Sequence, residues 1–513
     1  MSRLVTSRER LAVAPTRGVV VWFIACSWSA RAPVSGAADD ASDGGKDGHR
    51  CRIPISPGAG THGRTPGARW VGGVSEVGSR HRWPRAAAFL AFGPTPITRS
   101  VAMSPTLFPQ APGTTVVVGA GQAGLAMSRC LTDRGLPHVV LDRAGVADAW
   151  HSRRWDSFTL LSPNRRSRLP GWHYTGDDPD GFMTGPEVAR YLQDYARSFD
   201  APVQAGVDVQ RLYRVAGGWR LTTSAGPVTA ADVVVATGEL AAPRIPSLRW
   251  DLPARIEQVH TADYRNPDGL APGAVLVVGA GPSGQQIALE LARAGRTVHL
   301  AVGRHKALPR RYRGVDAYDW MDLLGMLDRT VDTLPGPPGR SPNAVLAGGT
   351  RDLDVARLAG AGVALHGRLL GVGHKTLAFG DDLAGYVADA DDNAVGFRRA
   401  VDEYVARTGM DVPAEAHPAA PQVSAAPAPG LDDIAVVVWA TGFSRDHGWI
   451  EAPVHGADGQ VVHRRGVTAA AGLYVLGLRW QYRRSSASLD GVGADAEYLG
   501  GVIASRAAAL TAA

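Results

Sequence analysis

The chain has 513 residues, of which 45% are hydrophobic and 20% are charged, a balance typical of a globular protein with about two to four domains. No apolar run approaches the roughly 18 residues that a membrane-spanning helix needs. Three cysteines without a C-x-x-C pair exclude a disulfide framework, a zinc ribbon and a dithiol–disulfide reductase.

The net charge of +6 comes from one end of the chain. Residues 1–102 hold 14 basic and 6 acidic residues, which leaves 40 basic and 42 acidic residues for the remainder. The remainder therefore offers no basic excess for binding nucleic acid.

Residues 1–110 are rich in Arg, Gly, Ala, Pro and Ser and show no sustained apolar period, which predicts a disordered extension. Three interpretations of this segment stay open. Translation could begin at Met103, so that residues 1–102 are a mis-annotated extension, or the segment is translated and unstructured. It could also act as a secretory signal, because basic residues precede the apolar stretch 18–26 and a small-residue site at Ala30-Arg-Ala32 follows.

Residues 112–142 predict a strand, a glycine turn, a helix and a second strand that ends in an acid. The first glycine permits a tight turn, the second lets a pyrophosphate approach the backbone, and the third lets the helix pack closely on the strand. The acid follows the first glycine by 23 residues, where a ribose hydroxyl would bind. The candidate ligands of this first dinucleotide are Gly119, Gly121, Gln122, Ala123, Gly124 and Asp142.

Residues 273–303 repeat the unit with one change at the ribose position. Gly303 stands where the acid would be, and Arg304, His305 and Lys306 follow it. A guanidinium can pair with a 2′-phosphate, so the second unit is predicted to bind NADP(H) through Arg304, although a solvated loop charge is the alternative. The other candidate ligands are Gly279, Gly281, Pro282, Ser283 and Gly284.

An acid at one ribose and a cation at the other predict FAD in the first unit and NADPH in the second. Two further buried strands, 232–238 and 433–443, each carry Ala-Thr-Gly at the carboxyl end, followed in the second by Phe443. Small residues at the carboxyl end of a strand let the chain turn where a cofactor crosses, although an ordinary strand end would look the same. Ala440, Thr441 and Gly442 are therefore candidate cofactor contacts.

The predicted fold class is α/β, with two Rossmann-like, doubly wound domains. Pro243 and Pro246 mark a crossover out of the first domain, and the Pro/Ala-rich stretch 418–429 marks the return. We expect an FAD-binding domain made of residues 111–242 and 427–513, with an NADPH-binding domain of residues 243–426 inserted in it.

The order GAGQAG, ATG, GAGPSG, basic loop and ATGF resembles the flavin-dependent monooxygenases with two dinucleotide-binding domains. Residues 112–513 look most like bacterial CzcO-like oxidoreductases related to the plant YUCCA-type enzymes. The resemblance implies that NADPH reduces FAD and that reduced FAD activates O₂ as a C4a-hydroperoxide, which oxygenates a small organic substrate. It also implies that Gly491-Val-Gly-Ala-Asp495 opens a final helix beside the flavin, with Asp495 as an FAD-associated residue.

One family fingerprint is incomplete. The fingerprint F-x-G-x-x-x-H aligns with Ala254, Ile256 and His260, so that only the histidine matches. Arg265-Asn-Pro stands where a Baeyer–Villiger enzyme would carry tryptophan. The sequence therefore argues against a Baeyer–Villiger reaction.

Three residues outside the glycine motifs are further candidates. Trp150 is expected to form a wall of the flavin site, with a core aromatic as the alternative. Asn164 is a candidate catalytic residue that would hydrogen-bond the oxygen species or the nicotinamide amide, unless it is only a turn residue. His260 is the second catalytic candidate, near NADPH, and the alternative is a satisfied structural histidine.

Two other functions stay open: an NADPH oxidase or dehydrogenase that passes electrons to another acceptor, and a redox or nucleotide sensor without turnover. The sequence contains no metal-binding motif, and no metal is expected. The expected partners are a small-molecule substrate and O₂, without nucleic acid or stable membrane insertion. A homo-oligomer remains open. Two soluble nucleotide cofactors favour a cytoplasmic location.

Overall fold

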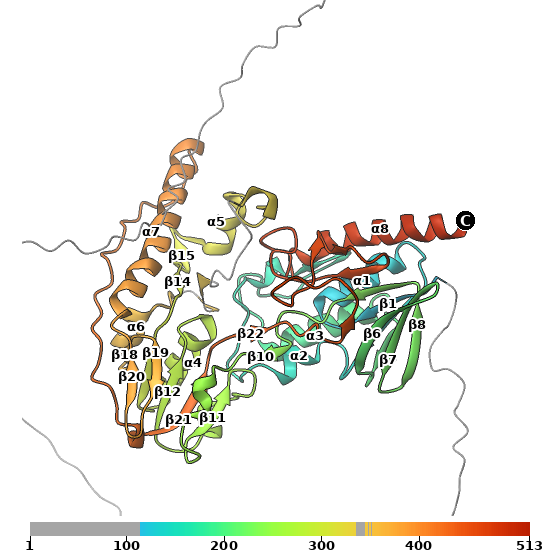
Figure 1. Ribbon diagram of the computed structural model, residues 1–513. Helices are drawn as coiled ribbons and strands as arrows, with labels where there is room; N and C mark the ends of the chain where they lie inside the picture. The colour runs from blue at the N-terminus through green and yellow to red at the C-terminus, as the bar shows by residue number, and fades with distance from the viewer. Residues whose placement is uncertain (1–112, 335–343, 347, 350, 513) are drawn as a thin grey trace, which may run out of the picture. The chain divides into compact units, whose positions relative to one another are not determined.

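The computed structural model describes residues 113–512, apart from residues 335–343, 347 and 350. The expectations for residues 1–110 lie outside the described residues. The described chain forms the predicted α/β fold, in which helices pack on two sheets whose central strands are parallel (Figure 1). Among the described residues, no helix combines the length and the hydropathy needed to cross a membrane.

The first sheet is built around a glycine-turn strand, and its strand order is β24-β25-β26-β9-β1-β2-β5. Strands β26 to β5 run parallel, and the edge strands β24 and β25 are antiparallel. The strands are β1 (Thr115–Val118), β2 (His138–Asp142), β5 (Val203–Ala205), β9 (Asp232–Val235), β24 (His463–Arg464), β25 (Val467–Thr468) and β26 (Leu473–Val475).

Alternate side chains of β1 enter two different cores, as expected for a strand that is buried on both faces. Val117 packs against α1 (Gln122–Thr132), α3 (Gly185–Arg197) and α8 (Val492–Ala512). Val116 and Val118 pack instead against Trp219 of a mixed sheet with the order β23-β6-β7-β8, in which β23 pairs parallel with β6 and the other pairs are antiparallel. That sheet consists of β6 (Val209–Val215), β7 (Gly218–Thr223), β8 (Gly226–Ala230) and β23 (Ile450–Glu451).

The second sheet is entirely parallel, with the order β11-β21-β12-β13-β18. Val275 and Val277 face a core shared with α4 and α6, whereas Leu276 and Val278 face a core shared with the hairpin β19–β20. The strands are β11 (Glu257–His260), β12 (Ala274–Val278), β13 (Val298–Ala301), β18 (Ala364–His366) and β21 (Ile434–Trp439). The elements packed on them are α4 (Pro282–Arg293), α6 (Val355–Gly360), β19 (Leu369–Val372) and β20 (Leu377–Phe379).

The chain crosses between the two sheets twice, and the crossing segments pair with each other. β10 (Ala242–Pro243) and β22 (Phe443–Ser444) form a short antiparallel ribbon. Pro243, where the sequence analysis placed the outward crossing, lies in this ribbon. The predicted return at residue 427 is wrong, because β21 pairs with β11 and β12 of the second sheet. A buried apolar strand has the same sequence pattern in either sheet, so only the strand pairing could decide.

The remaining elements are helices, 3₁₀ turns and short strand pairs outside the two large sheets. The helices are α2 (Asp148–Ser152), α5 (Ala317–Leu323) and α7 (Leu383–Thr408), with 3₁₀ turns at Asn164–Arg166, Ser247–Trp250, Pro267–Gly269, Val331–Thr333 and Leu431–Asp433. The short strand pairs are β3 (Arg168–Leu169) with β4 (Trp172–His173), β14 (Lys306–Ala307) with β17 (Ala344–Val345), and β15 (Arg311–Tyr312) with β16 (Val315–Asp316).

Candidate functional site

The two glycine turns share one construction. Gly119 and Gly279 have φ angles of +108° and +110°, which L side chains rarely adopt. A Cβ atom at either position would lie 2.6 Å from the carbonyl oxygen of Ala236 or Ala440, respectively. Each Ala-Thr-Gly segment therefore forms the surface on which a glycine turn rests, which explains why the sequence repeats both motifs.

The helices that follow the turns begin without side-chain caps. The N-cap residues of α1 and α4 are Gly121 and Gly281, and neither has a side chain to accept from the first N–H groups. By contrast, Thr184 caps α3 and Asp354 caps α6. A Cβ atom at Gly121 or Gly281 would meet nothing within 4 Å. Free N–H groups facing open space are what a pyrophosphate requires, so both turns fit a dinucleotide.

Asp142 ends β2 beside the first turn. One carboxylate oxygen accepts from the Ala120 N–H at 2.8 Å, and the other accepts from the N–H groups of Ala144 and Gly145 at 2.9 Å each. These bonds orient the acid at the edge of the turn, where it can still accept a bond from a ribose hydroxyl.

The matching position in the second unit is basic. Arg304 follows β13 and is exposed, and Arg368 follows the neighbouring strand β18. Both arginines line the same cleft as Gly303, and Arg368 lies 3.8 Å from Asp382. The sequence analysis missed Arg368, because only the pairing of β13 with β18 brings it beside Arg304.

A cleft of about 2180 Å³ is lined by both glycine turns and by both ribose positions. Its volume is enough for two dinucleotides to share, and each part of it carries the donors that one of them needs. The predicted residues that line it are Gly119, Gly121, Gln122, Ala123, Asp142, Trp150, Gly279, Gly281, Pro282, Ser283, Arg304, Ala440, Thr441 and Gly442. Gly124 and Gly284 lie behind the turns, where a Cβ atom would collide with the Gly119 or Gly279 carbonyl oxygen.

Trp150 lies next to the first turn as a cleft wall. Its indole N–H donates to the Gln122 side-chain oxygen at 3.2 Å. Phe158 packs against it at 6.1 Å, and the Arg154 guanidinium lies 4.9 Å over its ring. Burial, with a smaller contribution from the neighbouring charge of Arg153, lowers the pKa of Arg154 to about 10.

Asn164 does not line the cleft. Its amide N–H donates to the Asp178 carbonyl oxygen at 2.9 Å, and its oxygen accepts from the Met183 N–H at 2.6 Å. The side chain is only 4% exposed. It therefore holds together the loop that runs from residue 164 to residue 183.

His260 also lies behind the cleft surface, at the end of β11. Its Nδ1 accepts from the Ala262 N–H at 3.1 Å, so the ring proton is on Nε2, which donates to the Gly442 carbonyl oxygen at 3.0 Å. Burial lowers its pKa, and the ring packs edge-on against Phe443 at 4.8 Å. A neutral histidine thus supports the second Ala-Thr-Gly turn where the chain recrosses.

Asp495 lies in the first turn of α8, is 1% exposed and does not line the cleft. Burial raises its pKa, while Ser486, Arg483 and Arg465 favour its charged form. Of the three residues proposed outside the glycine motifs, Asn164, His260 and Trp150, only Trp150 reaches the cleft surface.

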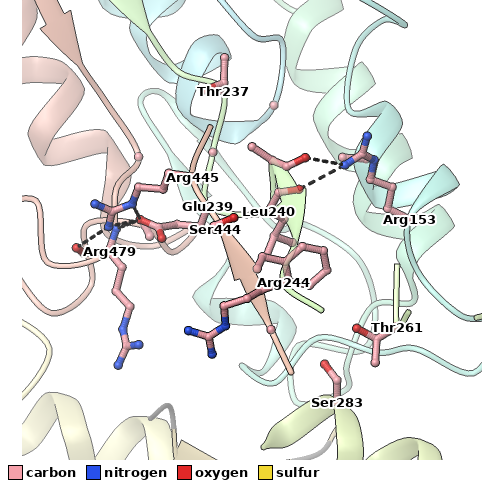
Figure 2. Close-up of a pocket in the computed structure, with 18 of the residues that line it drawn as sticks. Arg153, Thr237, Glu239, Leu240, Arg244, Thr261, Ser283, Ser444, Arg445 and Arg479 are labelled. Atoms are coloured by element: carbon pink, nitrogen blue, oxygen red, sulfur yellow. Dashed lines mark hydrogen bonds and ion pairs between the residues drawn. The ribbon is translucent and has the colours of Figure 1, made fainter. Parts of the chain in front are cut away.

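The cleft also contains charged residues that the sequence analysis missed (Figure 2). Glu239, directly after the first Ala-Thr-Gly, pairs with Arg445 and accepts from the Arg479 backbone N–H. Arg153 donates to the Leu240 and Ala241 carbonyl oxygens at 3.2 and 3.4 Å. These contacts join residues that are far apart in sequence, so no local pattern could reveal them.

A family model described as pyridine nucleotide-disulphide oxidoreductase matches residues 116–314. A CzcO-like oxidoreductase of Geobacillus kaustophilus is 34% identical over 388 residues, which cover 75% of this chain and 96% of the relative. Indole-3-pyruvate monooxygenase YUCCA1 of Oryza sativa is 33% identical over 212 residues, which cover 40% of this chain and 51% of the relative.

Among solved structures, the flavin-containing monooxygenase of Stenotrophomonas maltophilia shares the fold, with a TM-score of 0.54 and 21% identity over 77% of this chain and 98% of that chain. No group of three or more His, Cys, Asp or Glu residues in the described part of the chain could hold a metal ion. The paired turns, their opposite ribose charges and these similarities agree: the chain belongs to the family of CzcO-like oxidoreductases, with FAD and NADPH as cofactors.

Proposed function

We propose that the protein is an NADPH-dependent monooxygenase that acts on a small organic substrate with O₂ in the cleft described above. The observation that carries this proposal is that both dinucleotide turns line this cleft, with an acid at one ribose position and arginines at the other. In the overall reaction one oxygen atom enters the substrate and the other leaves as water, while NADPH supplies two electrons and solvent supplies a proton.

When bound, NADPH supplies the reducing electrons and FAD passes them to O₂. The residues of this chain bind and orient the two groups. The N–H groups at Gly121 and Gly281 would hold the pyrophosphates, Asp142 would hold the first ribose, and Arg304 with Arg368 would hold the 2′-phosphate.

We assign positioning roles to the two predicted catalytic residues. Asn164 holds the loop that ends at Met183, and His260 holds the turn at Gly442. Trp150, with Phe158 packed on it, lines the cleft with apolar surface that helps to exclude water from the reaction.

The related YUCCA1 protein is named for oxygenation of indole-3-pyruvate. That name supports a small organic molecule as the substrate class here. We also propose a cytoplasmic location, because both cofactors are soluble nucleotides.

The test uses the purified full chain with its flavin. We expect NADPH to reduce the flavin faster than NADH under anaerobic conditions. With ¹⁸O₂ and panels of thioethers, ketones and 2-oxo acids, a product should carry one labelled oxygen. NADPH consumption that yields only hydrogen peroxide with every panel member would instead support an oxidase. A flavoprotein that completes no catalytic cycles with any acceptor would support a sensor.

A further inference from the structure

Among the described residues, two arginines that line the cleft and a lysine close to them have no acidic side chain bound to them. Arg479 and Arg484 follow β26 and line the cleft, and Lys306 in β14 lies near both. Within the described part of the chain, none of these three side chains forms an ion pair or a hydrogen bond. We refer to Lys306, Arg479 and Arg484 as the cationic wall.

The electrostatics of the cationic wall are unfavourable without a ligand. Burial lowers the pKa of Lys306, and the charges of Arg484 and Arg479 lower it further. Burial also lowers the pKa of both arginines. Glu239 favours the charged form of Arg479, but its carboxylate already binds Arg445 and the Arg479 backbone N–H. Figure 2 shows the Arg479 side chain extending away from Glu239. An anion is the ligand that would relieve this repulsion.

The backbone holds the cationic wall in place. The Arg484 N–H donates to the Arg329 carbonyl oxygen at 3.0 Å, and the Val331 N–H donates to the Tyr482 carbonyl oxygen at 2.9 Å. The segment after α5 is thereby fixed beside residues 482–485. Trp480 has a φ angle of +56°, which is unusual for a residue other than glycine, and it lines the cleft next to Arg479. Such strain is kept only where surrounding contacts impose it.

Apolar side chains accompany the cations. Tyr318 of α5, Val331 and Trp480 line the same cleft. The Tyr318 hydroxyl lies near the Arg484 guanidinium, which favours the ionised form of the phenol and opposes the rise in its pKa that burial causes. The ligand that fits these residues has an anionic end and an apolar body.

The coenzyme phosphates have other donors in the cleft. The uncapped N-termini of α1 and α4 face the pyrophosphate positions, and Arg304 and Arg368 stand at the 2′-phosphate position of the second unit. Arg479 and Arg484 instead follow a strand of the first sheet. They are therefore available for a third ligand.

We propose that Arg479 and Arg484, with Lys306 beside them, bind the carboxylate of the substrate, so that the enzyme acts on small organic acids with an apolar body. This inference rests on the proposed monooxygenase function and names its substrate class.

The test measures binding rather than turnover. Visible-spectrum titrations of the oxidised flavoprotein would give dissociation constants for benzoate, 3-phenylpropionate and phenylpyruvate, each paired with its neutral amide. A buried charge-assisted contact is worth about 1.5–3 kcal/mol, so at least one acid should bind about 10–100-fold more tightly than its amide. Arg484→Gln should abolish this preference, Arg484→Lys should restore part of it, and the dissociation constant of NADPH should stay within about twofold.

Arg220→Gln is the matched control, because Arg220 is exposed on β7 and lies outside the cleft. Arg479→Gln is the second variant and should also reduce the preference. The proposal fails if every acid binds no more tightly than its amide. It also fails if Arg484→Gln weakens NADPH binding as much as acid binding, because the arginine would then be a coenzyme ligand. Acid binding without ¹⁸O incorporation into any acid would refute the monooxygenase function and leave the anion site standing.

Discussion

Adding one methyl group at Gly281 should separate coenzyme binding from folding. Gly281 has φ −72° and ψ −179°, a conformation that alanine adopts without strain, and its Cβ atom would meet no protein atom within 4 Å. We therefore expect Gly281→Ala to change the free energy of unfolding by no more than about 1 kcal/mol. Alanine stabilises the protein because it restricts the unfolded chain, and it destabilises the protein because it is a poorer N-cap residue than glycine, so the two effects oppose each other.

The methyl group occupies the space through which a pyrophosphate reaches the first N–H groups of α4. Displacing the phosphate weakens one charge-assisted hydrogen bond, which is worth about 1.5–3 kcal/mol. The dissociation constant of NADPH should rise about 10–100-fold. Because Gly121 is built in the same way, Gly121→Ala should weaken FAD binding instead and leave NADPH affinity unchanged in the protein that retains flavin.

Equilibrium dialysis of NADPH, flavin fluorescence on dilution and thermal unfolding measure these three quantities. Gly385→Ala in α7 is the control, because its Cβ atom also meets nothing within 4 Å and it lies outside the cleft. Gly279→Ala is the opposite case, since its φ of +110° and a contact of 2.6 Å with the Ala440 carbonyl oxygen should lower the melting temperature. Unchanged NADPH affinity in Gly281→Ala would refute the assignment of the second turn.

Three further predictions concern the coenzyme choice and the buried histidines. Arg304→Ala should raise the KM for NADPH about tenfold and leave the KM for NADH unchanged. Adding Arg368→Ala should raise the KM for NADPH further. Equal effects on the KM values of both coenzymes would contradict the assignment of these arginines to the 2′-phosphate. His260→Ala should lower the free energy of unfolding by about 1–3 kcal/mol, because the Gly442 carbonyl and the Ala262 N–H lose their hydrogen-bond partner. If the variant instead loses more than hundredfold in kcat while its free energy of unfolding is unchanged, His260 has a catalytic role. Burial holds the pKa of His447 at about 4, against 6.5 for the free side chain, so its stabilising contribution is complete above about pH 6.5 and is lost as the pH falls. Urea unfolding at pH 5 should show a loss of about 2 kcal/mol relative to pH 8 from this group, and His447→Gln should reduce that pH dependence.

The sequence by itself determined the parts of the site that depend on local backbone geometry. A tight turn, a close phosphate approach and close helix packing each require glycine at a fixed spacing, so Gly119, Gly121 and Gly124 could be assigned without coordinates. The first unit has Asp142 at its ribose position, and the second unit has Gly303 followed by Arg304. This difference in charge can be read from the sequence alone, and it likewise indicated that the two units bind different riboses.

The tertiary structure decided everything that depends on which strands pair and which loops meet. Strand β21 could have joined either sheet, because its apolar sequence satisfies both, and only its pairing with β11 and β12 moved the second Ala-Thr-Gly turn into the second unit. Arg368 follows β18, whereas Arg479 and Arg484 both follow β26, and strand pairing brings these two chain segments to the same cleft. His260 was a plausible catalyst in the sequence, and only the fold shows that its ring is buried and hydrogen-bonded to Ala262 and Gly442, since burial and partners are properties of the tertiary structure.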